Sequence, residues 1–160
     1  MNKLGFTLVE MLVAIAILSI VLLVGIPSFN ALIKSSNMSS NSSDLVSALN
    51  YARIESVKRG TSVELSQTDN ASWEAGLVVW VDEDNNDSMG SDEVLRYWGE
   101  FGSGSAIVSD GGISSFIFSA SGEVNNNDIL TLCDDRTGET GREITILSSG
   151  AVYAMEVDCE

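Results

Sequence analysis

The sequence contains no histidine and little positive charge. Its 160 residues include 8 lysines and arginines against 23 aspartates and glutamates, which gives a net charge of −15 at neutral pH. Without histidine, the chain lacks the commonest general base and the commonest zinc ligand of proteins. It also has no serine in a nucleophile-elbow context and no glycine-rich phosphate loop. These absences make an enzyme the least favoured class of function.

Basic residues are scarcest in the C-terminal part of the chain. From residue 61 onward, 20 acidic residues face only three arginines, Arg96, Arg136 and Arg142. A surface of this charge repels phosphate backbones, so direct nucleic-acid binding is not expected. A solvated acidic surface outside the cytoplasm explains the charge better than a specific acidic function does.

Cysteine is limited to two residues near the C-terminus, Cys133 and Cys159. A cysteine pair in an exported domain predicts one disulfide, whereas two separate buried thiols are the alternative. Closing this loop would stabilise the fold by roughly 3–4 kcal/mol on the chain-entropy model.

Charge is also missing from a long stretch near the N-terminus. Between Met11 and Ile26, only Ser19 and Gly25 interrupt an apolar run, and no signal-type cleavage site follows it. As a helix, residues 6–29 would span roughly 36 Å, enough to cross a membrane. Lys3 favours a cytoplasmic N-terminus, so the rest of the chain is expected on the outer side. The chain's single proline, Pro27, predicts a kink or local melting there.

Glu10 is the one charge inside this apolar segment. A carboxylate within a membrane costs a few kcal/mol on insertion scales and is normally kept for a partner. Alternatively, Glu10 lies at the membrane interface, where the cost is small. The position alone does not decide between these two interpretations.

Gly5, followed by Phe-Thr-Leu-Val-Glu at 6–10 and then the apolar run, resembles the processing site of type IV pilins and type II secretion pseudopilins. The resemblance implies cleavage between Gly5 and Phe6 by a prepilin peptidase and N-methylation of Phe6. It also implies that Glu10 assembles subunits by meeting the amine of a neighbour. The protein would first lie in the bacterial inner membrane with its head in the periplasm, and then in a filament with other pilin or pseudopilin subunits.

Four segments follow from these patterns. They are a leader at 1–5, a transmembrane helix at 6–29, an amphipathic continuation at 30–60, and a β-rich head at 61–160. The amphipathic stripe includes Leu45, Leu49 and Ala52, and Gly60 is a stop signal. Runs of strand type occur at 61–66, 76–81, 93–98, 114–119, 129–133, 142–147 and 151–157, with a hairpin turn at 148–150. The predicted fold class is α+β, a long helix packed on an antiparallel head.

Within the pilin class, the head resembles the GspH/FimT group, which includes FimU-like minor pilins. The resemblance rests on fragments in the family's order: Leu49 to Glu55, Gly76 to Asp82, Val94 to Arg96, Leu130 to Asp134 and Ile146 to Gly150. It implies a low-abundance subunit that helps to prime or cap filament assembly. Some relatives bind DNA through basic residues after the last hairpin glycine. Here no arginine follows Arg142, which argues against that role.

The acidic loop, residues 82–93, is the candidate metal site. Asp82, Asp84, Asn86 and Glu93 have the oxygen-ligand spacing of a calcium loop. Asp87 occupies the place usually held by glycine, so a solvated loop is the favoured interpretation and calcium the alternative. No other cofactor is expected. The three tryptophans are expected to pack rather than to form a binding patch.

Three hypotheses follow for the whole chain. The first is a minor pilin or pseudopilin that assembles through its helix. The second is a binding module at a filament tip, which contacts a surface, a ligand or calcium. The third is an enzyme held by a plain membrane anchor. Glu10 separates the first from the third, because a plain anchor needs no carboxylate.

Overall fold

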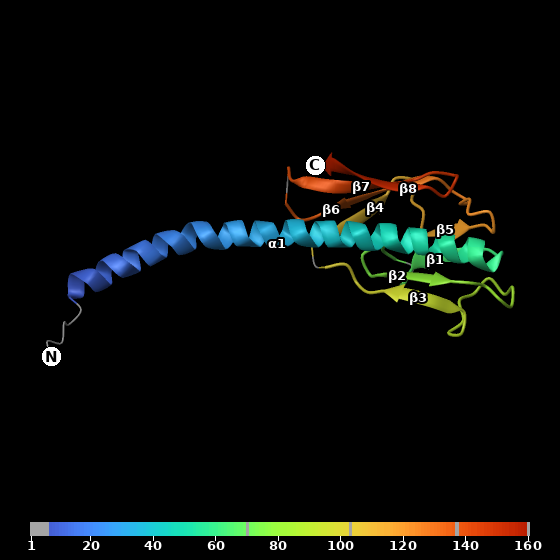
Figure 1. The fold of residues 1–160 in the computed structure, drawn as a ribbon, viewed down its shortest axis with the longest axis horizontal. Coiled ribbons are helices and arrows are strands. Elements are labelled where there is room, and N and C mark those ends of the chain that lie inside the picture. The colour runs from blue at the N-terminus through green and yellow to red at the C-terminus, as the bar shows by residue number, and fades with distance from the viewer. Residues whose placement is uncertain (1–6, 70, 103, 137, 160) are drawn as a thin grey trace. The chain divides into compact units, whose positions relative to one another are not determined.

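In the computed structural model, the described residues are 7–69, 71–102, 104–136 and 138–159. They belong to two compact units, Met1–Ser36 and Asn37–Glu160. One helix, α1 (Leu8–Arg59), runs through both units, and all strands lie in the second (Figure 1).

The end of α1 follows the expected signals. Lys58 and Arg59 form its basic last turn, where cations interact favourably with the helix dipole. Gly60 has a φ of 68°, and its amide donates a 2.9 Å hydrogen bond to the carbonyl of Ser56. This left-handed residue ends the helix where the sequence predicts it.

The expectation of local melting at Pro27 is wrong. Residues on both sides of Pro27 are helical, and α1 is continuous. A proline removes one backbone donor, whereas the apolar turns before and after it keep their own hydrogen bonds. The loss is therefore too small to open the helix.

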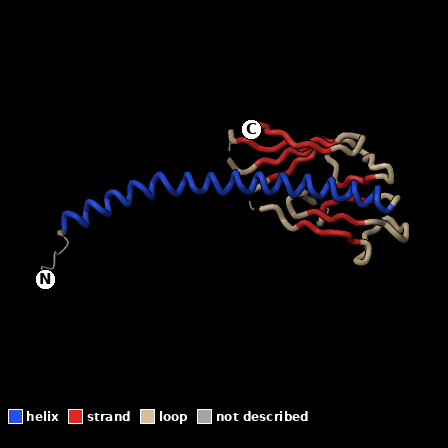
Figure 2. Tube along the Cα trace, in the orientation of Figure 1, coloured by secondary structure: helices blue, strands red, loops and turns tan. Residues whose placement is uncertain are grey.

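Among the residues that the structure describes, eight strands form two antiparallel four-stranded sheets. One sheet has the order β3-β2-β1-β5 and the other the order β4-β6-β7-β8, and both run alongside the second half of α1 (Figures 1 and 2). The strands are β1 (Val63–Gln67), β2 (Leu77–Trp80), β3 (Val94–Trp98), β4 (Ala106–Ser109), β5 (Ser115–Phe118), β6 (Asp128–Cys133), β7 (Thr140–Ile146) and β8 (Val152–Asp158). The α+β class, the seven predicted runs and the hairpin at 148–150 are confirmed, whereas β4 has no predicted counterpart.

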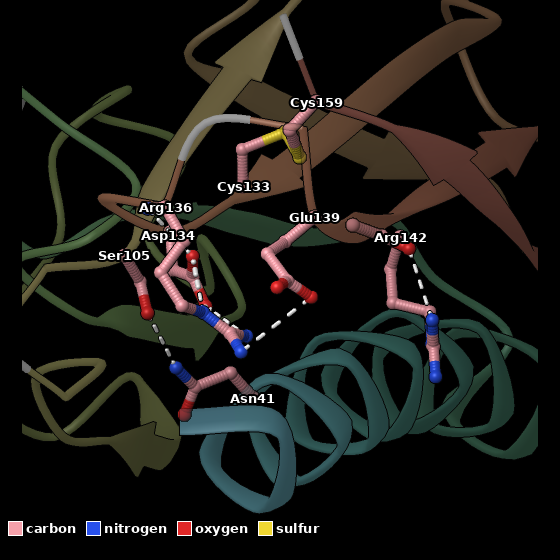
Figure 3. Close-up of polar contacts among 9 residues, drawn as sticks. Asn41, Ser105, Cys133, Asp134, Arg136, Glu139, Arg142 and Cys159 are labelled. Carbon is pink, nitrogen blue, oxygen red and sulfur yellow. Dashed lines mark hydrogen bonds and ion pairs between the residues drawn. A yellow bond between two sulfur atoms is a disulfide. The ribbon is translucent and has the colours of Figure 1, made fainter. Parts of the chain in front are cut away.

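A single hydrophobic core joins α1 to both sheets. The predicted stripe of α1 is fully buried, with Leu45, Leu49 and Ala52 each 0% exposed. At the start of this unit, Asn41 of α1 donates a 2.9 Å hydrogen bond to Ser105 (Figure 3). The largest buried side chains from the sheets are Phe116, Phe118, Leu65, Leu77, Leu130, Leu132, Ile144 and Ile146.

The three tryptophans are packing residues, as expected. Trp73, Trp80 and Trp98 are 2%, 7% and 8% exposed. The indole nitrogen of Trp73 donates to the carbonyl of Ile113, and that of Trp80 donates to the hydroxyl of Ser66. The indole nitrogens of Trp73 and Trp80 are thus satisfied inside the head.

Cys133 and Cys159 form the predicted disulfide (Figure 3). Cys133 ends β6 and Cys159 follows β8, whereas β7 lies between these two strands. The bridge therefore crosses over the strand in the middle. It fastens the C-terminus to a strand that β8 does not touch.

Candidate assembly site

The first half of α1 presents apolar side chains on all sides. Seventeen large hydrophobic residues between Leu8 and Ile33 are 44–76% exposed. By length and composition, α1 is the described helix that is able to cross a membrane. This surface needs either lipid or other apolar helices around it.

Glu10 lies in the first turn of α1 and takes part in a reciprocal cap with Thr7. The Thr7 amide and hydroxyl each donate a 2.9 Å hydrogen bond to Oε2 of Glu10, and the Glu10 amide donates a 3.2 Å bond back to the Thr7 hydroxyl. This is the geometry of a capping box. It holds the carboxylate at the very start of the apolar helix.

Thr7 is a site residue that the sequence analysis missed. The signal was present, because a threonine three residues before a glutamate, ahead of an apolar run, is the sequence pattern of a capping box. The motif was interpreted for processing and for assembly through Glu10, so its role in helix capping was overlooked. Gly5 and Phe6 lie outside the described residues, and cleavage between them stays a prediction.

The acidic loop brings together three of its four proposed ligands. Single carboxylate oxygens of Asp82, Asp84 and Glu93 all lie within 4.8 Å of one another. Asn86 has a different role, since its amide nitrogen donates 2.8 Å to Asp84 and its oxygen accepts 2.7 Å from the Ser88 amide.

Backbone amides of the same loop already bind these carboxylates. Asp82 accepts from the amides of Asn86 and Asp87, both at 3.1 Å. Glu93 is 5% exposed and accepts from the amides of Glu83 and Gly90 at 2.8 and 2.7 Å. These bonds stabilise the folded conformation of the loop.

Two residues of the acidic loop have a left-handed backbone. The φ angles of Asn85 and Asp87 are 57° and 56°. Asp87 therefore adopts the backbone conformation for which calcium loops usually carry glycine. Calcium binding stays a prediction, and calorimetric titration with calcium tests it. If calcium produces neither binding heat nor a change in melting temperature, the acidic loop is a solvated connection between two strands.

The negative charges of the acidic loop act on Glu64 of β1. Burial raises the pKa of its carboxyl group above the usual 4.5, a hydrogen bond with Ser115 acts in the opposite direction, and the charges of Asp82 and Asp87 raise it further. The acidic loop thus makes a half-buried carboxylate harder to ionise.

Two family models match the sequence. The model of the type II transport protein GspH matches residues 41–150, and that of the prokaryotic N-terminal methylation motif matches residues 1–26. No curated protein matches significantly.

Two crystal structures of the type IV minor pilin FimU from Pseudomonas aeruginosa have the same fold. In space group P21, the match has a TM-score of 0.67 at 19% identity and covers 78% of this chain and 92% of FimU. In space group P65, the TM-score is 0.63 at 20% identity, with coverage of 73% and 91%.

Proposed function

Since the chain belongs to the type II transport protein GspH family and is a minor pilin or pseudopilin, we propose that it enters a type IV pilus-like filament through its N-terminal helix and helps to prime or cap assembly. The observation that carries this proposal is the exposed apolar surface of the first half of α1, with one carboxylate in the first turn.

The cost of an unpaired charge in an apolar medium favours a neighbouring subunit that brings a positive charge to Glu10. Once lipid or other helices surround α1, the Glu10 carboxylate is in a medium of low dielectric constant, where an unpaired charge is costly. Cleavage after Gly5 would create a cationic amine at Phe6, at the start of the same helix. The amine of one subunit can then meet Glu10 of the next, which fixes the axial register between them.

The cap with Thr7 prepares Glu10 for this contact. Both hydrogen bonds that the carboxylate accepts from Thr7 end on Oε2. They restrict the side chain to the helix start, so a neighbour's amine meets an oriented acceptor. We infer that the first unit, Met1–Ser36, inserts the protein into the filament, and that the second unit, Asn37–Glu160, contacts other subunits.

The match to the methylation motif supports the finer parts of the proposal. Before assembly, the protein lies in the bacterial inner membrane with Asn37–Glu160 in the periplasm. A prepilin peptidase removes residues 1–5, and Phe6 is N-methylated. The disulfide between Cys133 and Cys159 fits the oxidising periplasm.

Replacing Glu10 with leucine tests the proposal. We expect normal membrane insertion, because the helix becomes more apolar, but at least about tenfold less protein in purified filaments, since a charge-assisted contact is lost. Thr7→Ala is the matched control. It removes the two hydrogen bonds of the Thr7 hydroxyl but keeps the backbone bond and the carboxylate, so we expect a smaller decrease.

Two results would contradict the proposal. One is unchanged filament incorporation of the Glu10→Leu variant. The other is a mature protein whose mass still includes residues 1–5, because no amine would then be available to pair with Glu10.

A further inference from the structure

Arg96 of β3 differs from the other cations of its unit. Its guanidinium has no carboxylate or carbonyl partner among the residues that the structure describes, although the chain holds 23 acidic residues. In contrast, Arg136 binds Asp134 at 2.6 Å (Figure 3), and Arg142 binds Glu156 at 3.1 Å. The remaining cations also have oxygen partners, Arg53 with carbonyls and Lys58 and Arg59 with Glu55.

Aromatic rings hold Arg96 in place. Its guanidinium carbon lies 4.5 Å from the ring centroid of Trp98 and 5.6 Å from that of Tyr51. Trp98 is itself buried and contacts Tyr51 of α1 edge-on at 5.6 Å. Stacking on two rings orients the guanidinium and leaves its N–H groups for an external acceptor.

The surroundings of Arg96 resemble the centre of a protein interface. Ile54, one helical turn beyond Tyr51 on α1, is 62% exposed. Arginine, tyrosine and tryptophan are the residue types enriched in binding hot spots, and here an exposed aliphatic residue follows the tyrosine on α1. The docking patch combines Tyr51 and Ile54 of α1 with Arg96 and Trp98 of β3.

We propose that Arg96 binds a carboxylate on the head of a neighbouring subunit in the filament. This inference rests on the proposed function, because assembly through α1 brings the neighbour close. Charge complementarity selects the occupant. The acidic residues of this chain would repel an extended polyanion, and one cation could not offset that repulsion. A single carboxylate on a protein partner contacts only the Arg96 guanidinium.

The size of the docking patch explains why it acts only within a filament. Four side chains offer far less than the roughly 800 Å² per partner of a stable complex. Helix assembly raises the effective concentration of the neighbour, so a small charge-assisted contact becomes sufficient. Its role is then to set which subunit lies beside this one.

The test compares full-length variants in cells that assemble the filament. We expect Arg96→Gln to lower incorporation about tenfold, the effect of losing a charge-assisted hydrogen bond. Arg96→Lys should lower it less, because it keeps the charge but loses the planar fork. Arg142→Gln is the matched control, since it removes the same charge from an arginine that has an intramolecular partner, and it should assemble normally.

A second measurement identifies the partner. A photo-crosslinker in place of Ile54 should form an adduct with an acidic segment of another filament subunit, and mass spectrometry of purified filaments would locate it. A lipid adduct, or normal incorporation of Arg96→Gln, would overturn the inference. An equal loss with Arg142→Gln would also overturn it. If Glu10→Leu reduces assembly and Arg96→Gln does not, the proposed function stands and this inference fails.

Discussion

Gly141 lies in β7 directly beneath the disulfide. A Cβ atom at this position would lie 2.5 Å from Sγ of Cys159, 3.0 Å from Sγ of Cys133 and 2.6 Å from the Leu132 carbonyl oxygen. Such distances are shorter than any ordinary contact, and two of the three atoms belong to the bridge. The absence of a side chain at this residue is therefore what allows the bridge to cross β7.

We expect Gly141→Ala to prevent or strain the disulfide. The loss should approach the roughly 3–4 kcal/mol that a bridge of this loop length contributes. Thiol titration of the denatured, unreduced protein would show free cysteines, and urea unfolding would show the loss. Gly99→Ala is the control, since a Cβ there meets nothing within 4 Å. Equal stability of the Gly141 and Gly99 variants would contradict this role.

The role of Gly141 was not predictable from the sequence, because it depends on which strands become neighbours, and the strand order β4-β6-β7-β8 is not written in any local pattern. Arg96 and Trp98 share one strand, but the packing of Tyr51 of α1 against both of them is a tertiary contact that no local pattern shows. Glu10 and the two cysteines were identified because their meaning is carried by residue type and context. Thr7 was equally local and was overlooked.

At the scale of elements, the long helix was predictable because its signals are strong and repeated. An apolar run, then an amphipathic stripe, then basic residues and Gly60 give its course. Strand β4 (Ala106–Ser109) was missed because it has four residues between serine- and glycine-rich segments. Such a short strand exists through its pairing with β6, and pairing is a tertiary property.

The last turn of α1 gives a prediction about pH. A hydrogen bond from Lys58, and to a smaller extent one from Arg59, holds the pKa of Glu55 below its usual 4.5. A lowered folded-state pKa means that the contribution to stability is present above the unfolded-state pKa and is lost as pH falls through the folded-state value. Glu55→Gln should cost roughly 0.5–1 kcal/mol at pH 7. Thermal unfolding at several pH values should show this difference vanishing in acid.

Glu64→Gln in β1 is the companion variant, for which we expect a change in stability of opposite sign. Burial raises the pKa of Glu64, so the charged form is less favourable in the folded protein than in the unfolded chain. Glu64→Gln should therefore raise the melting temperature at pH 7, and the gain should disappear as pH falls through the raised folded-state pKa. A loss of stability at pH 7 would show that its hydrogen bond with Ser115 outweighs the effect of burial.

At the scale of the whole molecule, the net charge of −15 sets the response to salt. Repulsion among 23 acidic residues destabilises the compact state, and few basic residues offset it. Raising ionic strength from about 0.01 to 1 M shortens the screening length from about 30 to 3 Å. The exposed ion pairs weaken as well, but each contributes little.

We therefore expect the fragment 37–160 to melt several degrees higher in about 0.5 M sodium chloride than in low salt. A lower melting temperature in salt would mean that ion pairs such as Arg142 with Glu156 outweigh the repulsion. Calcium chloride at matched ionic strength extends the test to the acidic loop. If the loop is a solvated connection, both salts raise the melting temperature equally. A larger rise with calcium, abolished by Asp84→Asn, would show a cation bound among Asp82, Asp84 and Glu93.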